Sequence, residues 1–122
     1  MDKDEIRRYL ANLYCVAASD GKSERAETTA IERIGREIRA GYFELKQAEE
    51  LARTDGLQID VAARWSDRIR NLEDMFFLAY GNSVLDPGEK SIIVDYANSL
   101  GIDQNQLNLV KQEAKRRHDA TA

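Results

Sequence analysis

Residues 8–17 read RYLANLYCVA, and residues 70–79, which begin 62 positions later, read RNLEDMFFLA. The correspondence extends without a gap over residues 8–52 and 70–114. Only seven of these 45 pairs are identical (at positions 8, 10, 17, 27, 31, 45 and 52 of the first copy), so the evidence is the shared spacing of apolar residues. The paired apolar positions are Leu10/Leu72, Leu13/Met75, Tyr14/Phe76, Val16/Leu78, Ala17/Ala79, Ile31/Ile93, Ile38/Leu100 and Leu45/Leu107. This repeat predicts two copies of one structural unit.

The apolar residues in each copy recur every three or four positions, as Leu10 and Leu13 do, which is the spacing of one face of an α-helix. Residues 60–80 could form one long helix or two short ones separated at Ser66 or Asp67. The expected helices cover about 4–19, 23–41, 43–54, 60–80, 86–101 and 103–118, with residues 119–122 frayed.

Capping and turn residues mark several of these helix ends. The run Asp86-Pro87-Gly88-Glu89 places an aspartate at the N-cap, a proline at the first helical position and a glutamate at the third. Asp103 with Gln106 is a second pair of this kind. Gly41 is expected to take the left-handed C′ position after the second helix, and Gly101 to end the fifth.

The fold class that follows is all-α, because no segment shows sustained period-two alternation and proline occurs once. We expect a single domain over 1–122, with six or seven helices forming two three-helix units related by a pseudo-twofold axis. The run Met75-Phe76-Phe77-Leu78 is apolar on nearly all sides and should lie centrally, covered on two faces. Trp65 is expected in the core or at the junction of the halves, and Cys15 and Phe77, which are repeat partners, at the seam between them.

The composition is that of a globular protein, with 43% hydrophobic and 33% charged residues. A net charge of −4 and a pI near 5.1 argue against nucleic-acid binding, which usually requires a basic surface. The basic run Lys115-Arg116-Arg117-His118 is interpreted as cations that favour a helix C-terminus. No stretch approaches 18 apolar residues and the N-terminus has no signal-peptide pattern, so we expect a cytoplasmic protein that does not span a membrane.

Two single-copy residues limit the catalytic possibilities. Cys15 is the only cysteine and lies in an apolar stretch, which favours a buried, reduced thiol over a nucleophile. His118 is the only histidine and is interpreted as a solvated helix-end residue. Nucleophilic triads and zinc sites therefore have no evident set of residues, and the seven glycines are too dispersed for a phosphate-binding loop.

A short acidic turn at the centre of each copy is the candidate functional site. The candidate ligands are Asp20, Glu24 and Glu27 in the first copy, and Asp86 and Glu89 in the second. Carboxylates that converge at a helix start could bind a hard cation such as Ca²⁺ or Mg²⁺. Helix capping is the alternative, since acidic N-cap and N3 residues satisfy free N–H groups and favour the positive end of the helix dipole. The EF-hand ligand pattern is not present.

The run Ala17-Ala18-Ser19-Asp20-Gly21, followed by Glu24 and Glu27, resembles the TerB (tellurite-resistance protein B) family. The second copy, which ends in Tyr96-Ala97-Asn98-Ser99-Leu100-Gly101-Ile102, resembles it too, so that the resemblance covers residues 6–114. It implies an all-helical domain of two related halves, with acidic turn residues that have been proposed to bind metal, in bacterial stress-response contexts.

Carried over residue by residue, Asp20 and Glu27 match the acidic positions of the first copy and Glu89 those of the second. Asn82 stands where the family pattern has aspartate, which removes a charge from the second site and favours the first.

These observations predict a non-enzymatic bacterial TerB-like domain that binds a protein partner, with Ca²⁺ or Mg²⁺ as a possible ion at the Asp20 turn and no other cofactor. One alternative is a purely structural interaction module whose acidic turns are only caps. A further alternative is an enzyme that uses Asp20 and Glu27 as acid and base, which would need a pocket and a shifted carboxylate pKa. An acidic surface with an apolar central helix is compatible with a monomer or a homodimer.

Overall fold

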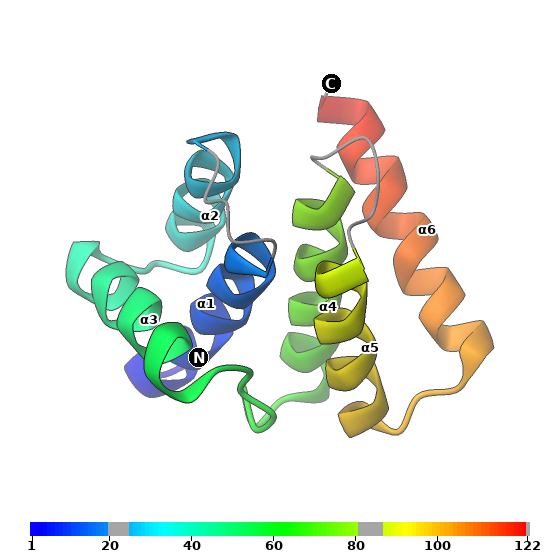
Figure 1. Ribbon diagram of the computed structural model, residues 1–122, viewed down its shortest axis with the longest axis horizontal. Helices are drawn as coiled ribbons and strands as arrows, with labels where there is room; N and C mark the ends of the chain where they lie inside the picture. The colour runs from blue at the N-terminus through cyan, green and yellow to red at the C-terminus, as the bar shows by residue number, and fades with distance from the viewer. Residues whose placement is uncertain (20–24, 81–86, 122) are drawn as a thin grey trace.

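The computed structural model describes residues 1–19, 25–80 and 87–121, and these residues form six α-helices and no strand (Figure 1). The all-α fold class is therefore confirmed. The helices are α1 (Lys3–Ala18), α2 (Arg25–Glu37), α3 (Tyr42–Asp55), α4 (Trp65–Tyr80), α5 (Pro87–Leu100) and α6 (Gln104–Thr121).

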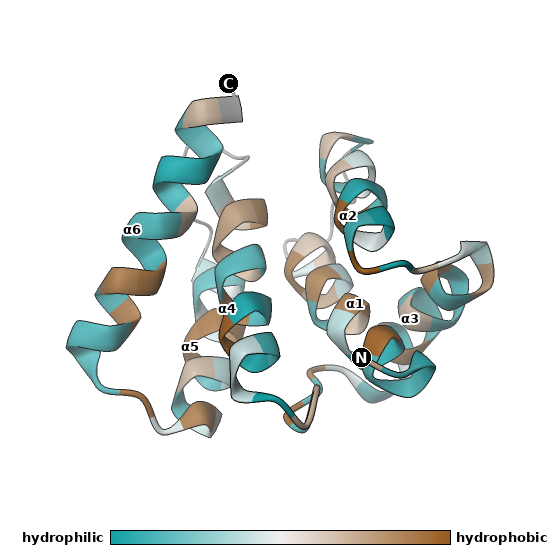
Figure 2. Ribbon diagram, turned by 180° about the vertical axis from the view of Figure 1, so that it is seen from behind, coloured by the Kyte–Doolittle hydropathy of each residue, from teal (hydrophilic) through white to brown (hydrophobic). Residues whose placement is uncertain are grey.

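Helices α1 and α4 form the centre of the molecule. α1 packs against α2, α3, α4 and α5, and α4 packs against α1, α2, α5 and α6. Helices α1–α3 therefore lie on one side and α4–α6 on the other, with the contact between α1 and α4 joining them (Figure 1). Seen from behind, α6 is hydrophilic along most of its length, as expected of an outer helix (Figure 2).

Many of the apolar positions that the repeat pairs lie in the core. The run 75–78 is buried, with exposed fractions of 5% or less, because α4 is covered on several sides. The prediction of a central helix covered on two faces is thereby confirmed. The largest side chains that are almost fully enclosed are Tyr9, Leu10, Leu13, Ile31, Ile34, Leu72, Met75, Ile93 and Tyr96.

Reciprocal capping boxes close the starts of two helices. Asp103 Oδ1 accepts a hydrogen bond of 2.8 Å from Gln106 N, and Gln106 Oε1 accepts one of 3.0 Å from Asp103 N, as predicted. Asp2 and Glu5 make the same pair of bonds at the start of α1, which the sequence reasoning missed. Gly101 follows α5 with φ of 69°, so the predicted end of that helix is confirmed.

The end of α2 differs from its prediction. The helix stops at Glu37, and Arg39, not Gly41, takes the left-handed conformation, with φ of 66°. Arg39 N donates to Arg36 O at 3.1 Å, while the next amide, that of residue 40, donates to Gly35 O at 2.7 Å, which is the bonding pattern of a Schellman motif. Gly41 has φ of −92° and is the N-cap of α3, because α3 begins at the very next residue.

The predicted helix over 60–80 begins only at Trp65, and Trp65 is 51% exposed, so both its predicted burial and the early helix start are wrong. In the connection between α3 and α4, the buried apolar residues are instead Val61 and Ala62, which are 0% and 3% exposed. At the C-terminus of the chain, the prediction that residues from 119 onward are frayed is also wrong, since α6 continues to Thr121.

Candidate functional site

Three of the five predicted metal ligands, Asp20, Glu24 and Asp86, lie outside the described residues. The other two, Glu27 and Glu89, lie in the first turns of α2 and α5 and are buried, with exposed fractions of 5% and 0%. They are repeat partners, so the two copies bury a glutamate at the same place. Among the described residues, no group of three or more histidine, cysteine, aspartate or glutamate side chains is arranged to hold a metal ion.

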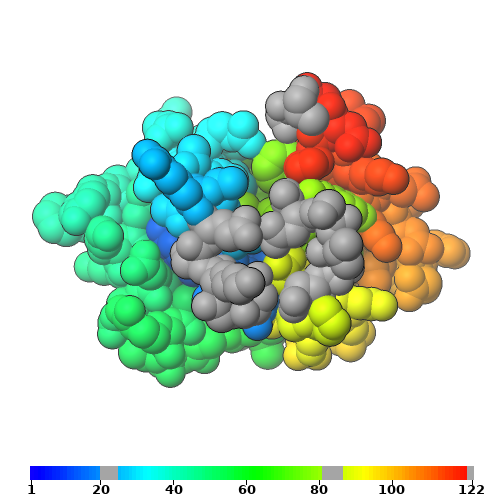
Figure 3. Space-filling model, turned by 45° about the horizontal axis from the view of Figure 1, so that its top comes forward, coloured from blue at the N-terminus to red at the C-terminus, as the bar shows by residue number. Residues whose placement is uncertain are grey.

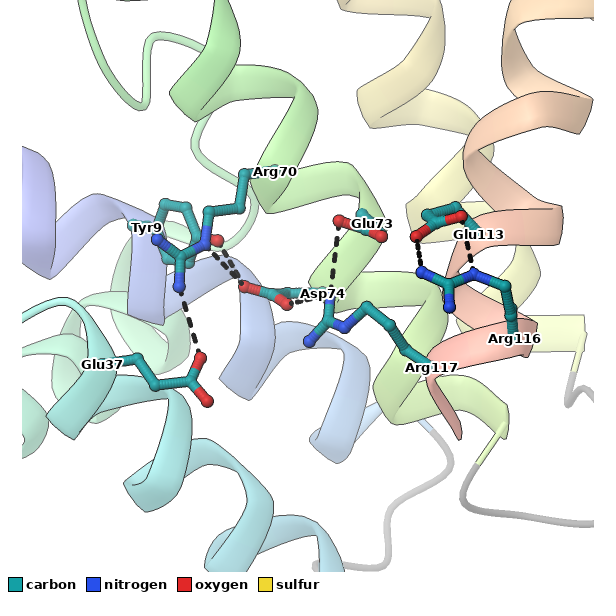
Figure 4. A network of polar contacts seen from close by, with 8 residues as sticks. All are labelled: Tyr9, Glu37, Arg70, Glu73, Asp74, Glu113, Arg116 and Arg117. Atoms are coloured by element: carbon teal, nitrogen blue, oxygen red, sulfur yellow. Dashed lines mark hydrogen bonds and ion pairs between the residues drawn. The ribbon is translucent and has the colours of Figure 1, made fainter. Parts of the chain in front are cut away.

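A buried aspartate that the sequence reasoning did not single out organises the centre of the molecule. The side chain of Asp74, on α4, has no exposed surface. It accepts hydrogen bonds from the Tyr9 hydroxyl on α1 and, at 3.0 Å, from Arg117 Nη1 on α6 (Figure 4). Arg70, one turn earlier on α4, brings its Nε to 3.9 Å from Asp74 Oδ2. One carboxylate therefore links three helices.

Further charges extend this cluster toward α2 and along α6. Arg70 forms a 3.3 Å ion pair with Glu37 at the end of α2, and Arg117 forms one of 3.2 Å with Glu73 (Figure 4). These contacts attach α2 and α6 to opposite sides of α4. We call Tyr9, Arg70, Asp74 and Arg117 the Asp74 cluster.

Burial and charge act in opposite directions within the cluster. Loss of water raises the pKa of Asp74, although the Tyr9 hydroxyl and the cations Arg117 and Arg70 oppose this rise. Burial likewise raises the pKa of Tyr9 far above its ordinary value, helped by the charge of Asp74. Burial on its own would lower the pKa of Arg117, but the charges of Asp74 and Glu73 outweigh it and raise that pKa. The cluster therefore contains a carboxyl group that is shielded from solvent and placed between a hydroxyl and two cations.

A neutral amide pair lies beside the cluster. Asn12 and Asn71, both fully buried, are joined by a 2.9 Å hydrogen bond from Asn12 Nδ2 to Asn71 Oδ1. Asn12 also binds both polar groups of the Gln58 backbone, at 2.7 and 2.8 Å, which fixes the connection between α3 and α4 onto α1. Asn71 Nδ2 donates to Tyr9 O at 3.0 Å. The bonds of Asn71 to Asn12 and to Tyr9 join α4 to α1 and so hold the two halves together.

The basic end of α6 takes part in packing, contrary to prediction. The Arg117 guanidinium carbon lies 4.9 Å from the centre of the Phe77 ring, and that of Arg33 on α2 lies 5.4 Å from it. His118 meets Phe77 edge-on at 5.8 Å and Tyr80 at 6.4 Å, so it is not a simple solvated residue. In the space-filling view, α4 reaches the surface between α2 and α6 (Figure 3). Arg117 and His118 therefore pack against α4, beyond any effect they have on the dipole of α6.

An exposed aromatic corner stands out on the surface of the first half. Tyr42 and Phe43, the first two residues of α3, are 68% and 74% exposed. Their rings meet edge-to-face with centroids 5.8 Å apart, and Lys46 Nζ lies 5.6 Å from the centre of the Tyr42 ring. The rings therefore support each other and are largely uncovered.

Cys15 is buried, as predicted, and burial raises the pKa of its thiol to about 11. A thiol with so high a pKa is almost entirely protonated near neutral pH, so it is a poor nucleophile.

The side chain of Asp74 is enclosed by its hydrogen-bonding partners. The signal that could have revealed Asp74 is its spacing of three from Asn71, which places both polar residues beside Leu72 and Met75 on the apolar face of α4. No described helix is both long and apolar enough to cross a lipid bilayer.

Comparison with protein-family models, curated proteins and solved structures finds no match to this chain.

Proposed function

We propose that this chain is a non-enzymatic helical module that binds a partner protein through the aromatic corner of Tyr42 and Phe43. The observation that carries the proposal is the exposure of two adjacent aromatic rings, at 68% and 74%. Tyrosine and phenylalanine are enriched at protein interfaces, where buried aromatic anchors supply much of the binding energy. Scattered exposed apolar residues need no explanation, but a preformed pair of rings is the kind of anchor that a partner pocket accepts.

The rigidity of the corner favours binding. The Schellman motif around Arg39 and the N-cap at Gly41 leave only four residues between α2 and α3, so the backbone under the rings is held at both sides. A rigid aromatic pair loses little conformational entropy when a partner covers it. A partner that fits this corner would present an apolar pocket wide enough for two aromatic rings.

We also propose that the two halves are related by a pseudo-twofold axis. Two hydrogen bonds between α1 and α4 support it. With the repeat offset of 62, Tyr9 corresponds to Asn71 and Asn12 to Asp74. The Tyr9–Asp74 bond thus maps onto the Asn71–Asn12 bond, which is the reciprocal pairing of a twofold interface. The left-handed residues after α2 and α5, at positions 39 and 101, are repeat partners as well.

Cation binding at the first acidic turn is a second candidate function. The observation that favours it is the burial of Glu27 at the start of α2, where Asp20 and Glu24 are close in sequence. Because the second copy has asparagine at position 82, its Glu89 should lack one of the carboxylates that an ion needs. Membership of the TerB family and a role in stress response belong to this proposal and rest on the sequence resemblance. A cytoplasmic location also belongs to it, as a prediction from the composition of the sequence.

Site-specific photo-crosslinking tests the proposed interface. Phe43 is replaced by p-benzoylphenylalanine, and Leu109, which is 65% exposed on α6, receives the same group as a matched control. We expect a discrete cross-linked protein from position 43 and none from position 109. Excess wild-type protein should compete for the partner and reduce this cross-linked product, whereas a Tyr42→Ser/Phe43→Ser variant should not. Equal cross-linking at both positions, or none at position 43, would contradict the proposed interface.

Calorimetric titration of Ca²⁺ into chelator-stripped protein tests the second candidate. Glu27→Gln removes a charge at the first site without changing side-chain size, and Glu89→Gln is the matched control in the second copy. Binding that is lost in Glu27→Gln and retained in Glu89→Gln is expected. If wild-type protein gives no saturable heat at millimolar Ca²⁺, the acidic turns are helix caps only.

A further inference from the structure

A small pocket opens between α1 and α3, and its walls differ from those of the corresponding place in the second half. It has a volume of about 280 Å³. Small side chains, those of Cys15 and three alanines, line it together with the Tyr14 ring and the charged residues Glu49 and Arg53. The lining residues are Tyr14, Cys15, Ala17, Ala18, Glu49, Ala52 and Arg53.

The repeat shows what the same place holds in the second copy. Positions 15 and 18 correspond to Phe77 and Tyr80, so a thiol and a methyl group are replaced by two aromatic rings. The Tyr80 ring stacks on Phe76, the repeat partner of Tyr14, with centroids 6.4 Å apart and an interplanar angle of 22°.

The hollow at the corresponding place between α4 and α6 has a volume of about 470 Å³, so the second half differs in what lines the space and not in a smaller space. It is lined by Tyr80 and by polar side chains of α6. Among the described residues, Tyr80, the repeat partner of Ala18, lines this hollow, whereas Phe77, Ala79 and Ala114, the partners of Cys15, Ala17 and Ala52, do not. The chain's own rings therefore occupy in the second half the place that small side chains leave open in the first.

We propose that the α1–α3 pocket binds a single-ring aromatic ligand of the size of a phenol. The ring lies where Tyr80 lies in the second copy, stacked on Tyr14 and beside the alanine side chains, with a polar substituent toward Glu49 and Arg53. The space is sufficient, because an apolar cavity of about 150 Å³ accepts benzene. This inference does not rest on the proposed protein interface, which lies at the other end of α3.

The test uses p-cresol, the side chain of tyrosine as a free molecule, titrated into the full chain. Alanine-methyl NMR reports on the pocket through Ala18 and Ala52, and the alkylation rate of Cys15 reports on access to it. We expect saturable shifts of these methyl signals, a dissociation constant on the order of 1 mM for a ligand of this size, and slower alkylation when p-cresol is bound.

Two variants connect the result to the repeat. Ala18→Tyr places in the first copy the ring that the second copy already has, and should weaken p-cresol binding at least tenfold. Ala18 is exposed, so this change is compatible with folding, and Ala18→Leu is a second blocking variant. Tyr80→Ala opens the second copy and should add a second set of shifts, around Ala79 and Ala114.

Cyclohexanol, which has a similar size but no aromatic face, is the control ligand and should bind several-fold more weakly. Absence of saturable shifts with wild-type protein, unchanged binding in both Ala18 variants, or equal binding of cyclohexanol would each overturn the proposal.

Discussion

Replacing Arg117 by methionine removes the nearest cation from the buried carboxylate of Asp74 and keeps an unbranched apolar side chain over Phe77. In the native protein, Arg117 Nη1 lies 3.0 Å from Asp74 Oδ1 and 3.2 Å from Glu73 Oε2. The Asp74 side chain has no exposed surface, whereas that of Arg117 is 28% exposed. The change therefore leaves a buried charge with weaker compensation, while the packing of the arginine stem is largely retained.

The expected cost follows from what remains around Asp74. Removing one partner of a buried ion pair typically costs about 3–5 kcal/mol. Here the Tyr9 hydroxyl still donates, Arg70 still lies 3.9 Å away, and water reaches part of the Arg117 site. We therefore expect the free energy of unfolding to fall by about 2–3 kcal/mol at pH 7.

The loss should depend on pH in a definite direction. Burial raises the pKa of Asp74 in the folded protein, and removal of Arg117 should raise it further. Between the unfolded and folded pKa values, folding takes up a proton, so stability increases as pH falls through the folded pKa. The cost of Arg117→Met should therefore shrink on acidification, since a protonated carboxyl needs no cation. Glu73, whose pKa burial also raises, titrates in the same direction.

Urea unfolding of four proteins isolates the Asp74 contribution: wild type, Arg117→Met, Asp74→Asn and the double variant. In the Asp74→Asn background, Arg117→Met should cost less than about 1 kcal/mol, because a neutral amide needs no counter-charge. An equal cost in both backgrounds, or a cost that grows as pH falls, would refute the electrostatic account of the cluster.

Four further substitutions test individual positions. Arg39→Gly should raise the free energy of unfolding by about 0.5–1 kcal/mol, because glycine adopts the observed φ of 66° without strain. Gly101→Ala should lower the free energy of unfolding, because alanine is strained at the observed φ of 69°. The midpoints of urea unfolding measure both effects. Asn12→Ala should cost about 2–3 kcal/mol by leaving the buried polar groups of Gln58 without a partner, and amide exchange there should accelerate. Phe77→Ala should cost about 3–5 kcal/mol in thermal unfolding, and wild-type stability would contradict its 5% exposure.

Features that depend on neighbours within one helical turn were predictable. The run 75–78 is apolar on nearly all sides of its helix, so its burial followed from the local sequence alone. The Asp103–Gln106 capping box was predictable for the same reason, because its two bonds span only three residues. The burial of Glu27 and Glu89 at equivalent positions agrees with the repeat, although the repeat does not say what those carboxylates meet.

Helix-end and junction details were less predictable because several residues compete for one role. Gly41 is the better left-handed residue by itself, but the bonds of the Schellman motif require that conformation at Arg39, two positions earlier. Trp65 is the largest apolar side chain near the junction, yet the smaller Val61 and Ala62 fit the space and the tryptophan remains 51% exposed.

The partners of Asp74 could not be predicted, for a different reason. Tyr9 and Asp74 are 65 positions apart, and Asp74 and Arg117 are 43 apart, so their meeting depends on how three helices pack and not on any local pattern. Periodicity along the chain thus determined the helical class, the repeat and the buried faces, because those follow from the geometry of a single helix. The polar partners that join the faces, and the pocket left where one copy has small residues, were decided only when the helices packed.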